Sequence, residues 1–348
     1  MKEMRETQFG RIKSGEVAKL FTLTNNLGMS ISVSNYGATL VRVIVPDSDG
    51  YPVDVVLGYD HAEGYENGGV FFGASVGRNA NRIGGAAIVV NDVRYELEKN
   101  DGENNLHSGN NPYSKRIWDV RNKNNQKVTF TLHSADGDQG YPGTLDMEVT
   151  YELTEENEVR ISYHCSPNKD TLINMTNHSY FNLNGHATGD ILNHTVAINA
   201  DAFTRADKYS IPTGEIVPVK GTPMDFKKKK KVGKEIDAAY EAVQFGNGYD
   251  HNWVLNDAGS FRKVAIATGD RSNITMEVYT DLPGMQFYTA NFVENEHGKD
   301  GAVYQKRDAM CFETQYFPDA VHHENFEQPI FKAGDIYQTS TMYKFIAG

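Results

Sequence analysis

Two residues of the sequence could exchange protons with a bound molecule, and both stand where a packed strand is expected. His178 lies in "TNHSYFNLNGH", residues 176–186, which alternates like a strand before it turns aromatic. Glu313 follows "AMCF", a run typical of a core strand, where an unpaired carboxylate is costly. His178 is therefore a proton donor, a packed core histidine or the centre of the sequon Asn177-His178-Ser179. Glu313 either pairs with a cation or serves the chemistry of a pocket.

A glycine-rich segment offers groups that suit a ligand with many hydroxyls. "GASVGRNANRIGG", residues 73–85, carries Arg78, Asn81 and Arg82, which together supply hydrogen-bond donors and acceptors. The segment lacks the ending and the glycine spacing of a nucleotide-binding loop, so nucleotide binding is not expected. Loop arginines paired with nearby acids are the alternative interpretation.

Other polar residues have structural and functional interpretations side by side. His107 precedes a glycine turn in "NNLHSG", and Asp250 begins the apolar run "DHNWVL", where aspartate is also a common turn residue. Alternation in "GMQFYTANF" places Gln286 and Tyr288 on one face of a strand. A buried glutamine at this position needs a hydrogen-bond partner.

No metal and no cofactor is expected. Cys165 and Cys311 are far apart in the sequence and form no CxxC pair, so two buried thiols are favoured over a single bridge. His322-His323-Glu324 could suggest a metal site, but adjacent residues of a strand point to opposite faces.

Short alternating or β-branched runs must position these residues. "MSISVSN", "KVTFTLHS", "EVRISYHC" and "ITMEVYTD" are typical of strands bounded by turn residues, and "AIVVNDVRYELE" indicates a tight hairpin at Asn91-Asp92. The best helical stretch, residues 232–243, is short. Without a repeat, linker or shift in composition, residues 1–348 are expected to form one all-β domain of large antiparallel sheets packed face to face.

The composition limits the partners. The 46 acidic and 34 basic residues give a net charge of −12, which argues against nucleic acid or an anionic membrane and favours a neutral small molecule. Lys227–Lys231 is interpreted as a solvated loop rather than a phosphate- or nucleic-acid-binding patch. No apolar signal segment opens the sequence, and no run approaches the roughly 18 apolar residues of a membrane helix. We therefore expect a cytoplasmic protein whose sequons are not used.

Several long segments, taken together, resemble the aldose 1-epimerase, or galactose mutarotase, family. They are "GRNANRI", "NNLHSG", "NMTNHSYFNLNG", "IPTGEIVPVKGTPMDF", "GYDHNWVL", "PGMQFYTANF" and "FETQYFPDAVHHENF". The resemblance runs from about Gly28 to Phe345. It implies a β-supersandwich of large antiparallel sheets. It also implies interconversion of the α and β anomers of D-galactose or D-glucose, without metal or cofactor. The protein is expected to be a monomer or homodimer.

The resemblance carries roles over to individual residues. Glu313 matches the family's general base and His178 its general acid. The implied sugar contacts are Asn81, Arg82, His107, Tyr180, Asp250 and Gln286. Departures from the family pattern are Ser108, Asn110 and the lysine run. Three alternatives stay open: a hexose-6-phosphate 1-epimerase, with Arg78 or the lysines holding the phosphate; a non-catalytic sugar-binding protein; and, more remotely, a glycosidase.

Overall fold

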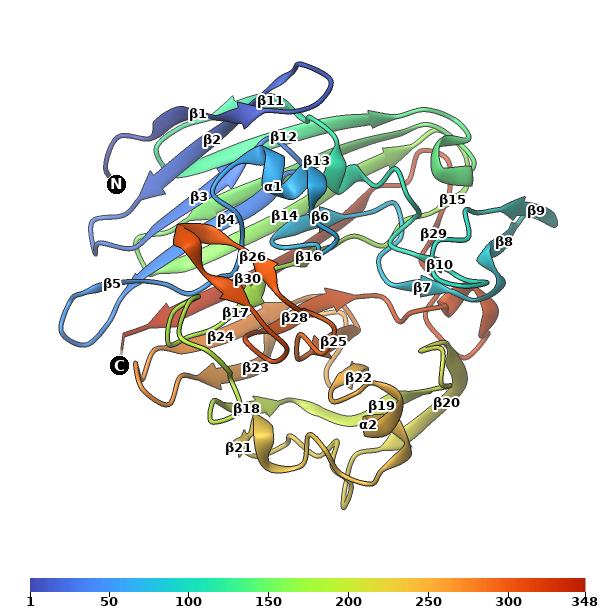
Figure 1. Cartoon of the computed structure of the whole chain (residues 1–348). Coiled ribbons are helices and arrows are strands. Elements are labelled where there is room, and N and C mark those ends of the chain that lie inside the picture. The colour runs from blue at the N-terminus through green and yellow to red at the C-terminus, as the bar shows by residue number, and fades with distance from the viewer. Residues whose placement is uncertain (348) are drawn as a thin grey trace.

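The largest sheet shows how the alternating runs of the sequence become strands. The computed structural model describes residues 1–347. Its nine-stranded antiparallel sheet has the order β11-β12-β13-β14-β30-β24-β23-β18-β21 (Figure 1). In chain order these strands are β11 (Asp119–Lys123), β12 (Lys127–Ser134), β13 (Leu145–Leu153), β14 (Glu158–Pro167), β18 (Thr195–Ile198), β21 (Lys230–Lys231), β23 (Arg262–Thr268), β24 (Thr275–Thr280) and β30 (Tyr337–Ile346). β13 buries every second residue, as its sequence predicts.

A six-stranded and a five-stranded sheet form the second layer. The six-stranded sheet has the order β17-β28-β25-β22-β19-β20, and the five-stranded sheet joins β1 to β5 in sequence order. The former contains β17 (Tyr180–Phe181), β19 (Ala200–Ala206), β20 (Pro212–Pro218), β22 (Asp250–Leu255), β25 (Gly284–Tyr288) and β28 (Met310–Gln315). The latter contains β1 (Arg5–Arg11), β2 (Val17–Thr24), β3 (Ser30–Ser34), β4 (Thr39–Pro46) and β5 (Pro52–Asp54).

Aromatic contacts place both smaller sheets on the same face of the large one. Phe21 of β2 packs on Phe130 of β12, with ring centroids 5.8 Å apart. Phe181 of β17 packs on Tyr343 of β30 at 4.8 Å. The strand register puts Phe130 and Tyr343 on one face of the nine-stranded sheet, so both contacts bury that face. This arrangement confirms the predicted all-β supersandwich.

Short strand pairs and turns complete the fold outside the three large sheets. The pairs are β6 (Ala74–Val76) with β16 (Thr176–His178), β7 (Arg82–Ile83) with β10 (Asn105–Leu106), β8 (Ala87–Val90) with β9 (Val93–Glu96), β15 (Thr171–Leu172) with β29 (Ile330–Phe331) and β26 (Glu296–His297) with β27 (Val303–Tyr304). Asn91 and Asp92, between β8 and β9, have φ angles of 50° and 62°. Positive φ at both positions is what a two-residue type I′ hairpin requires, so the predicted hairpin is confirmed.

Helices are few and short. The α-helices are α1 (Ala62–Asn67) and α2 (Glu241–Phe245), and 3₁₀ turns are η1 (Gly84–Ala86), η2 (Tyr113–Lys115), η3 (Asp138–Gly140), η4 (Val232–Lys234), η5 (Lys299–Gly301) and η6 (Ala320–His322). The helical stretch expected over residues 232–243 is therefore split into η4 and the start of α2. Gly233 is a poor helix former, and the turn that follows buries Ile236 in the main core. Within residues 1–347, no helix has the length and apolar character needed to cross a membrane.

Candidate active site

One face of the six-stranded sheet is polar, although its strands are buried. Paired residues of neighbouring antiparallel strands point to the same side of a sheet. One row across β22, β25, β28 and β17 carries Asp250, Tyr288, Cys311 and Tyr180, and the next row carries Gln286 and Glu313. The intervening Phe287 and Phe312 point to the opposite face and pack in the main core. Strand alternation thus separates a structural face from a face available for chemistry.

The opposite wall comes from the short strand pairs. His178 ends β16, which pairs with β6. Asn81 and His107 both have positive φ, 65° and 51°, and are joined by two hydrogen bonds. In one of them the Asn81 backbone N–H donates to His107 Nδ1 at 3.1 Å. Arg82 Nε donates to Asp101 at 2.7 Å, which fixes the guanidinium at the rim of the site.

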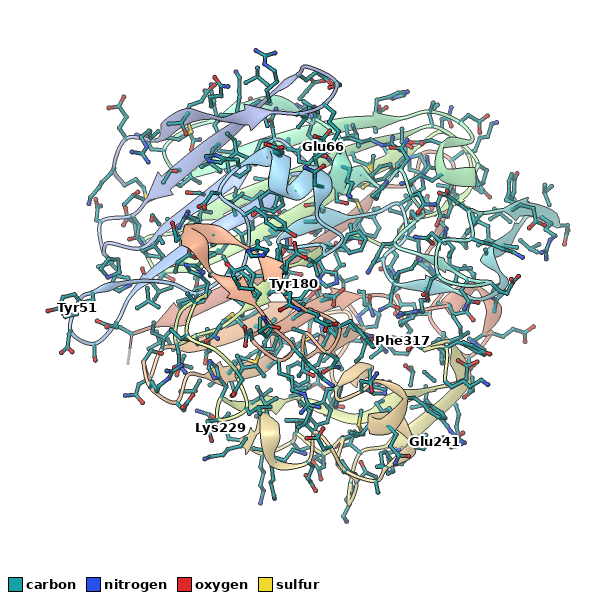
Figure 2. The ribbon with its side chains drawn as sticks, viewed as in Figure 1. Tyr51, Glu66, Tyr180, Lys229, Glu241 and Phe317 are labelled. Carbon is teal, nitrogen blue, oxygen red and sulfur yellow. The ribbon has the colours of Figure 1, made fainter. Side chains whose placement is uncertain are left out.

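All the site residues predicted from the sequence line one cavity of about 410 Å³, within the usual range of small-molecule sites. They are Asn81, Arg82, His107, His178, Tyr180, Asp250, Gln286 and Glu313. Tyr180 lies near the middle of the molecule, well away from Lys229 (Figure 2). The cavity thus brings together segments that are more than 200 residues apart in the sequence, such as those of Asn81 and Glu313.

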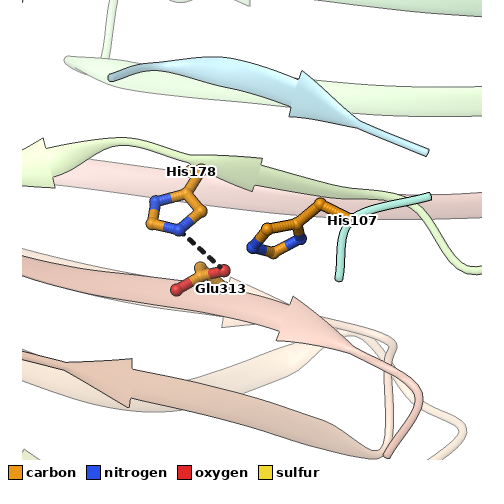
Figure 3. A group of neighbouring side chains, drawn as sticks. All are labelled: His107, His178 and Glu313. Atoms are coloured by element: carbon orange, nitrogen blue, oxygen red, sulfur yellow. Dashed lines mark ion pairs between the residues drawn. The ribbon is translucent and has the colours of Figure 1, made fainter. Parts of the chain in front are cut away.

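His178 and Glu313 face each other across this cavity. His178 Nε2 lies 3.5 Å from Glu313 Oε2, and both side chains are buried (Figure 3). The His178 ring is stacked between Tyr180, at 5.0 Å and 16°, and Phe71, at 5.8 Å and 20°. Two aromatic planes thus fix the orientation of the imidazole, with Nε2 directed at the carboxylate.

Burial changes the protonation of this pair. It raises the pKa of the Glu313 carboxyl well above its ordinary value, with the Asp250 carboxylate acting in the same direction and Arg82 opposing it. It lowers the pKa of His178 to about 4. Burial therefore favours the neutral form of both groups, whereas ordinary pKa values suggest an ionised carboxylate beside an imidazole. The neutral pair and the ion pair hold the same number of protons and differ only in where one proton lies.

His107, His178 and Glu313 also have ligand atoms within 4.8 Å of one another, which raises the question of a metal. His107 Nδ1 accepts the Asn81 N–H, so the remaining proton of the neutral ring is on Nε2. A metal-binding histidine shows the reverse arrangement, because its second nitrogen donates to an oxygen. Burial lowers the pKa of His107 well below its ordinary value and keeps the ring neutral. The arrangement suits a hydrogen-bond donor to a ligand oxygen better than a metal ligand.

His322 and His323 do not behave as neighbours on a strand. They follow a 3₁₀ turn, and both contact Asp319, His322 Nδ1 at 2.6 Å and His323 Nε2 at 3.4 Å. The assumption that they point to opposite faces was therefore wrong. The turn lets one carboxylate bind both rings.

The cationic segments considered as phosphate sites lie elsewhere. Arg78 is fully buried and donates to the carbonyls of Pro142 and Gly143, so it clamps a loop and does not reach the cavity. Lys227–Lys231 lines a separate depression. Four of these lysines have partners, namely Asp201 for Lys227, Thr268 for Lys229, Glu235 for Lys230 and Asn193 for Lys231.

Several residues of the cavity were not predicted from the sequence. Phe71 stacks on His178, Glu294 and Glu296 line the mouth, and Cys311 lies behind His178. The apolar run Val70-Phe71-Phe72 after two glycines is a weak signal of a functional loop. The two glutamates carry no signal, because their segment resembles any exposed turn.

Comparisons with known proteins agree with this geometry. Residues 19–344 match the aldose 1-epimerase family. The chain is similar to galactose mutarotase of Bos taurus (40% identity over 318 residues, 91% of each chain) and to aldose 1-epimerase of Escherichia coli (strain K12) (36% over 337 residues, 96% of each). A crystal structure of galactose 1-epimerase from Lactobacillus acidophilus NCFM superposes with a TM-score of 0.87 at 27% identity, covering 99% of both chains. The chain belongs to the aldose 1-epimerase family.

Proposed function

We propose that this protein is an isomerase that interconverts the α and β anomers of aldoses such as D-galactose and D-glucose. The observation that carries the proposal is the His178–Glu313 pair, 3.5 Å apart in a cavity lined by hydrogen-bonding side chains. The relatives named above, galactose mutarotases and an aldose 1-epimerase, support the same reaction.

The reaction moves two protons and needs no redox step. The pair reacts from its ion-pair form, in which the shared proton lies on His178 Nε2. Glu313 accepts the proton of the C1 hydroxyl while His178 Nε2 gives its proton to the ring oxygen, so the C1–O5 bond breaks and the open-chain aldehyde forms. Rotation about C1–C2 presents the other face of the carbonyl. Glu313 then returns its proton to the carbonyl oxygen as the C5 hydroxyl, which gives its proton back to His178, attacks C1. The enzyme ends in its starting protonation state.

The remaining polar residues suit the binding of sugar hydroxyls. We assign Asn81, Arg82, His107, Tyr180, Asp250 and Gln286 to this role. Gln286 Nε2 donates to Asp250 at 2.7 Å, which orients both side chains. Gln286 Oε1 has no hydrogen-bond partner among the described residues, and buried polar atoms of this kind call for one. A sugar hydroxyl can supply it.

The charge of the cavity favours neutral sugars over sugar phosphates. Besides Glu313, the acidic side chains of the cavity belong to Asp250, Glu294 and Glu296, whereas its guanidinium, that of Arg82, is already paired with Asp101. A phosphate in this cavity would meet like charges, which cost affinity. A hexose-6-phosphate 1-epimerase is therefore disfavoured. A sugar-binding protein without catalysis would not need the His178–Glu313 pair.

We also propose that the chain is a single domain that acts in the cytoplasm as a monomer or homodimer, without nucleic acid as a partner. One hydrophobic cluster supports the single domain, because it runs through all three large sheets, from Phe21 to Phe345. The net charge of −12 supports the exclusion of nucleic acid.

Polarimetry tests the function. Freshly dissolved α-D-galactose, α-D-glucose and α-D-glucose 6-phosphate are followed to rotational equilibrium with and without the protein, and the spontaneous rate is subtracted. We expect strong acceleration for the neutral sugars. No acceleration with any of the three sugars would contradict an aldose 1-epimerase, and preference for the phosphate would favour the phosphosugar enzyme.

A further inference from the structure

The second nitrogen of His178, Nδ1, faces a thiol. Cys311 Sγ lies 3.6 Å from His178 Nδ1, within reach of a weak hydrogen bond involving sulfur. Cys311 precedes Glu313 by two residues on β28, so both side chains point to the same face of the sheet. One strand therefore presents a group to each nitrogen of the imidazole, the thiol to Nδ1 and the carboxylate to Nε2.

Two other buried histidines, His107 beside His178 and His251 on the opposite face of the sheet, have a different kind of partner at Nδ1. His107 Nδ1 accepts the backbone N–H of Asn81, and His251 Nδ1 accepts that of Asp250, each at 3.1 Å. A backbone N–H that donates to Nδ1 leaves no room for a proton there, so both rings are held with their proton on Nε2. A proton on Nδ1 of either ring would point at the backbone N–H, so that two hydrogen-bond donors would face each other. His178 is different, because sulfur can accept a hydrogen bond as well as donate one.

We propose that the Cys311 thiol is a positioning residue that holds His178 with a proton on Nδ1, so that Nε2 alone exchanges a proton with the sugar. The inference rests on the proposed function. While Nε2 gives its proton to the ring oxygen and takes it back, the Nδ1–H keeps donating its hydrogen bond to Cys311 Sγ. The thiol therefore does not have to move during the reaction. Because sulfur is a weak acceptor, it orients the ring without making the proton on Nε2 harder to release. A carboxylate in its place would stabilise the imidazolium and weaken the acid.

The surroundings keep the thiol neutral. Burial raises the pKa of Cys311 well above its ordinary value, and the carboxylates of Glu313 and Asp250 add to this. Cys311 is therefore a thiol rather than a thiolate, and it does not form an ion pair with His178. The other titratable groups in contact with the His178 ring are His107, Tyr180 and Tyr288, and Arg82 lines the same cavity.

Two substitutions at Cys311 have opposite expected effects on the acid side of the pH profile. Cys311→Ala removes the acceptor, so the imidazolium is less stable and the acid limb of kcat/KM should move to lower pH. Cys311→Ser supplies a stronger acceptor, so the limb should move to higher pH. Loss of one such hydrogen bond should lower kcat of Cys311→Ala about three- to tenfold, with KM changed less than about twofold. Cys165→Ala is the matched control, an equally buried thiol that contacts Met175 Sδ at 3.4 Å in another part of the core.

The proposal is wrong if the two Cys311 variants leave the acid limb in place or move it in the same direction, or if Cys165→Ala loses as much kcat. A measurement on the unmodified protein avoids any folding defect of the variants. In ¹⁵N NMR of histidine-labelled protein near neutral pH, with His178 assigned from the spectrum of His178→Asn, we expect a protonated Nδ1 on His178 and an unprotonated Nδ1 on His107. An unprotonated Nδ1 on His178 overturns the proposal. This test needs no turnover, so it is distinct from failure of the proposed function, in which the wild type would not interconvert anomers.

Discussion

Glu313→Gln separates proton transfer from binding and folding. Glutamine keeps the size and much of the hydrogen-bonding capacity of the side chain, but it cannot accept the proton of the C1 hydroxyl. A positioned base contributes roughly 10²–10⁴-fold, so kcat should fall by that factor, which is a rise of about 2.7–5.5 kcal/mol in the activation free energy. KM should change far less, because the other polar residues of the cavity are untouched. Polarimetry with α-D-galactose, corrected for the spontaneous rate, measures both constants.

The stability of the same variant gives an internal control. The pKa of Glu313 is raised in the folded state, so its contribution to stability is present below the pKa of the unfolded chain and is lost as the pH rises through the folded pKa. Glutamine does not ionise and suffers no such loss. Glu313→Gln should therefore have a Tm equal to the wild type in acid and higher than the wild type at alkaline pH. Loss of activity could then not be ascribed to unfolding.

Asp250→Asn is the matched control, because it neutralises a second carboxylate of the same cavity. It should raise KM and reduce kcat less than Glu313→Gln does. If Glu313→Gln keeps more than roughly a third of kcat while Asp250→Asn loses the powers of ten expected of a base, the assignment of the base to Glu313 is wrong.

Further predictions concern pH, metal, substrate charge and binding. The kcat/KM profile should fall on the acid side near pH 4, where His178 takes up a second proton, and its alkaline limb should lie well above the ordinary pKa of a carboxyl, because burial raises the pKa of Glu313. An acid limb near 6.5, the ordinary value for histidine, would contradict the effect of burial on His178. Exhaustive dialysis against EDTA should leave the activity unchanged, and a loss restored by a divalent ion would contradict this. Glucose should have a much higher kcat/KM than glucose 6-phosphate. Glu296→Gln should narrow this difference in kcat/KM, because it removes a negative charge at the mouth of the cavity. An unchanged difference would show that the Glu296 carboxylate does not determine the preference for neutral sugars. Arg82→Ala should raise KM severalfold and lower kcat through misorientation, and an unchanged KM would show that this side chain does not hold the sugar.

The sequence predicts which side chains share a face of one strand better than it predicts which distant strands come into contact. Alternation along β25 correctly placed Gln286 and Tyr288 on one face, and the strand type around Glu313 was also correct. The contact between His178 and Glu313 spans 135 residues and depends on packing between sheet and strand pair, which no local pattern encodes. Only the family resemblance suggested that contact.

Protonation could not be predicted for the same reason. Composition and motifs give ordinary pKa values, whereas the shifts at His178 and Glu313 arise from burial by segments far away in the sequence. Cys311 was expected to be a buried thiol, as it is, but its position behind His178 required the register of β17 and β28. Local sequence patterns therefore predict the strands, whereas the protonation of the side chains on them depends on packing between distant segments.

The place of β30 in the nine-stranded sheet has a consequence for synthesis of the protein. This last strand lies between β14 and β24 and pairs with both. During translation, β14 and β24 are made long before the strand that joins them, so each exposes an open edge until β30 has left the ribosome. Open edges are templates for aggregation. A chain that terminates before Tyr337 could not close the sheet, and we expect it to be degraded or to aggregate rather than to persist as a partly active enzyme.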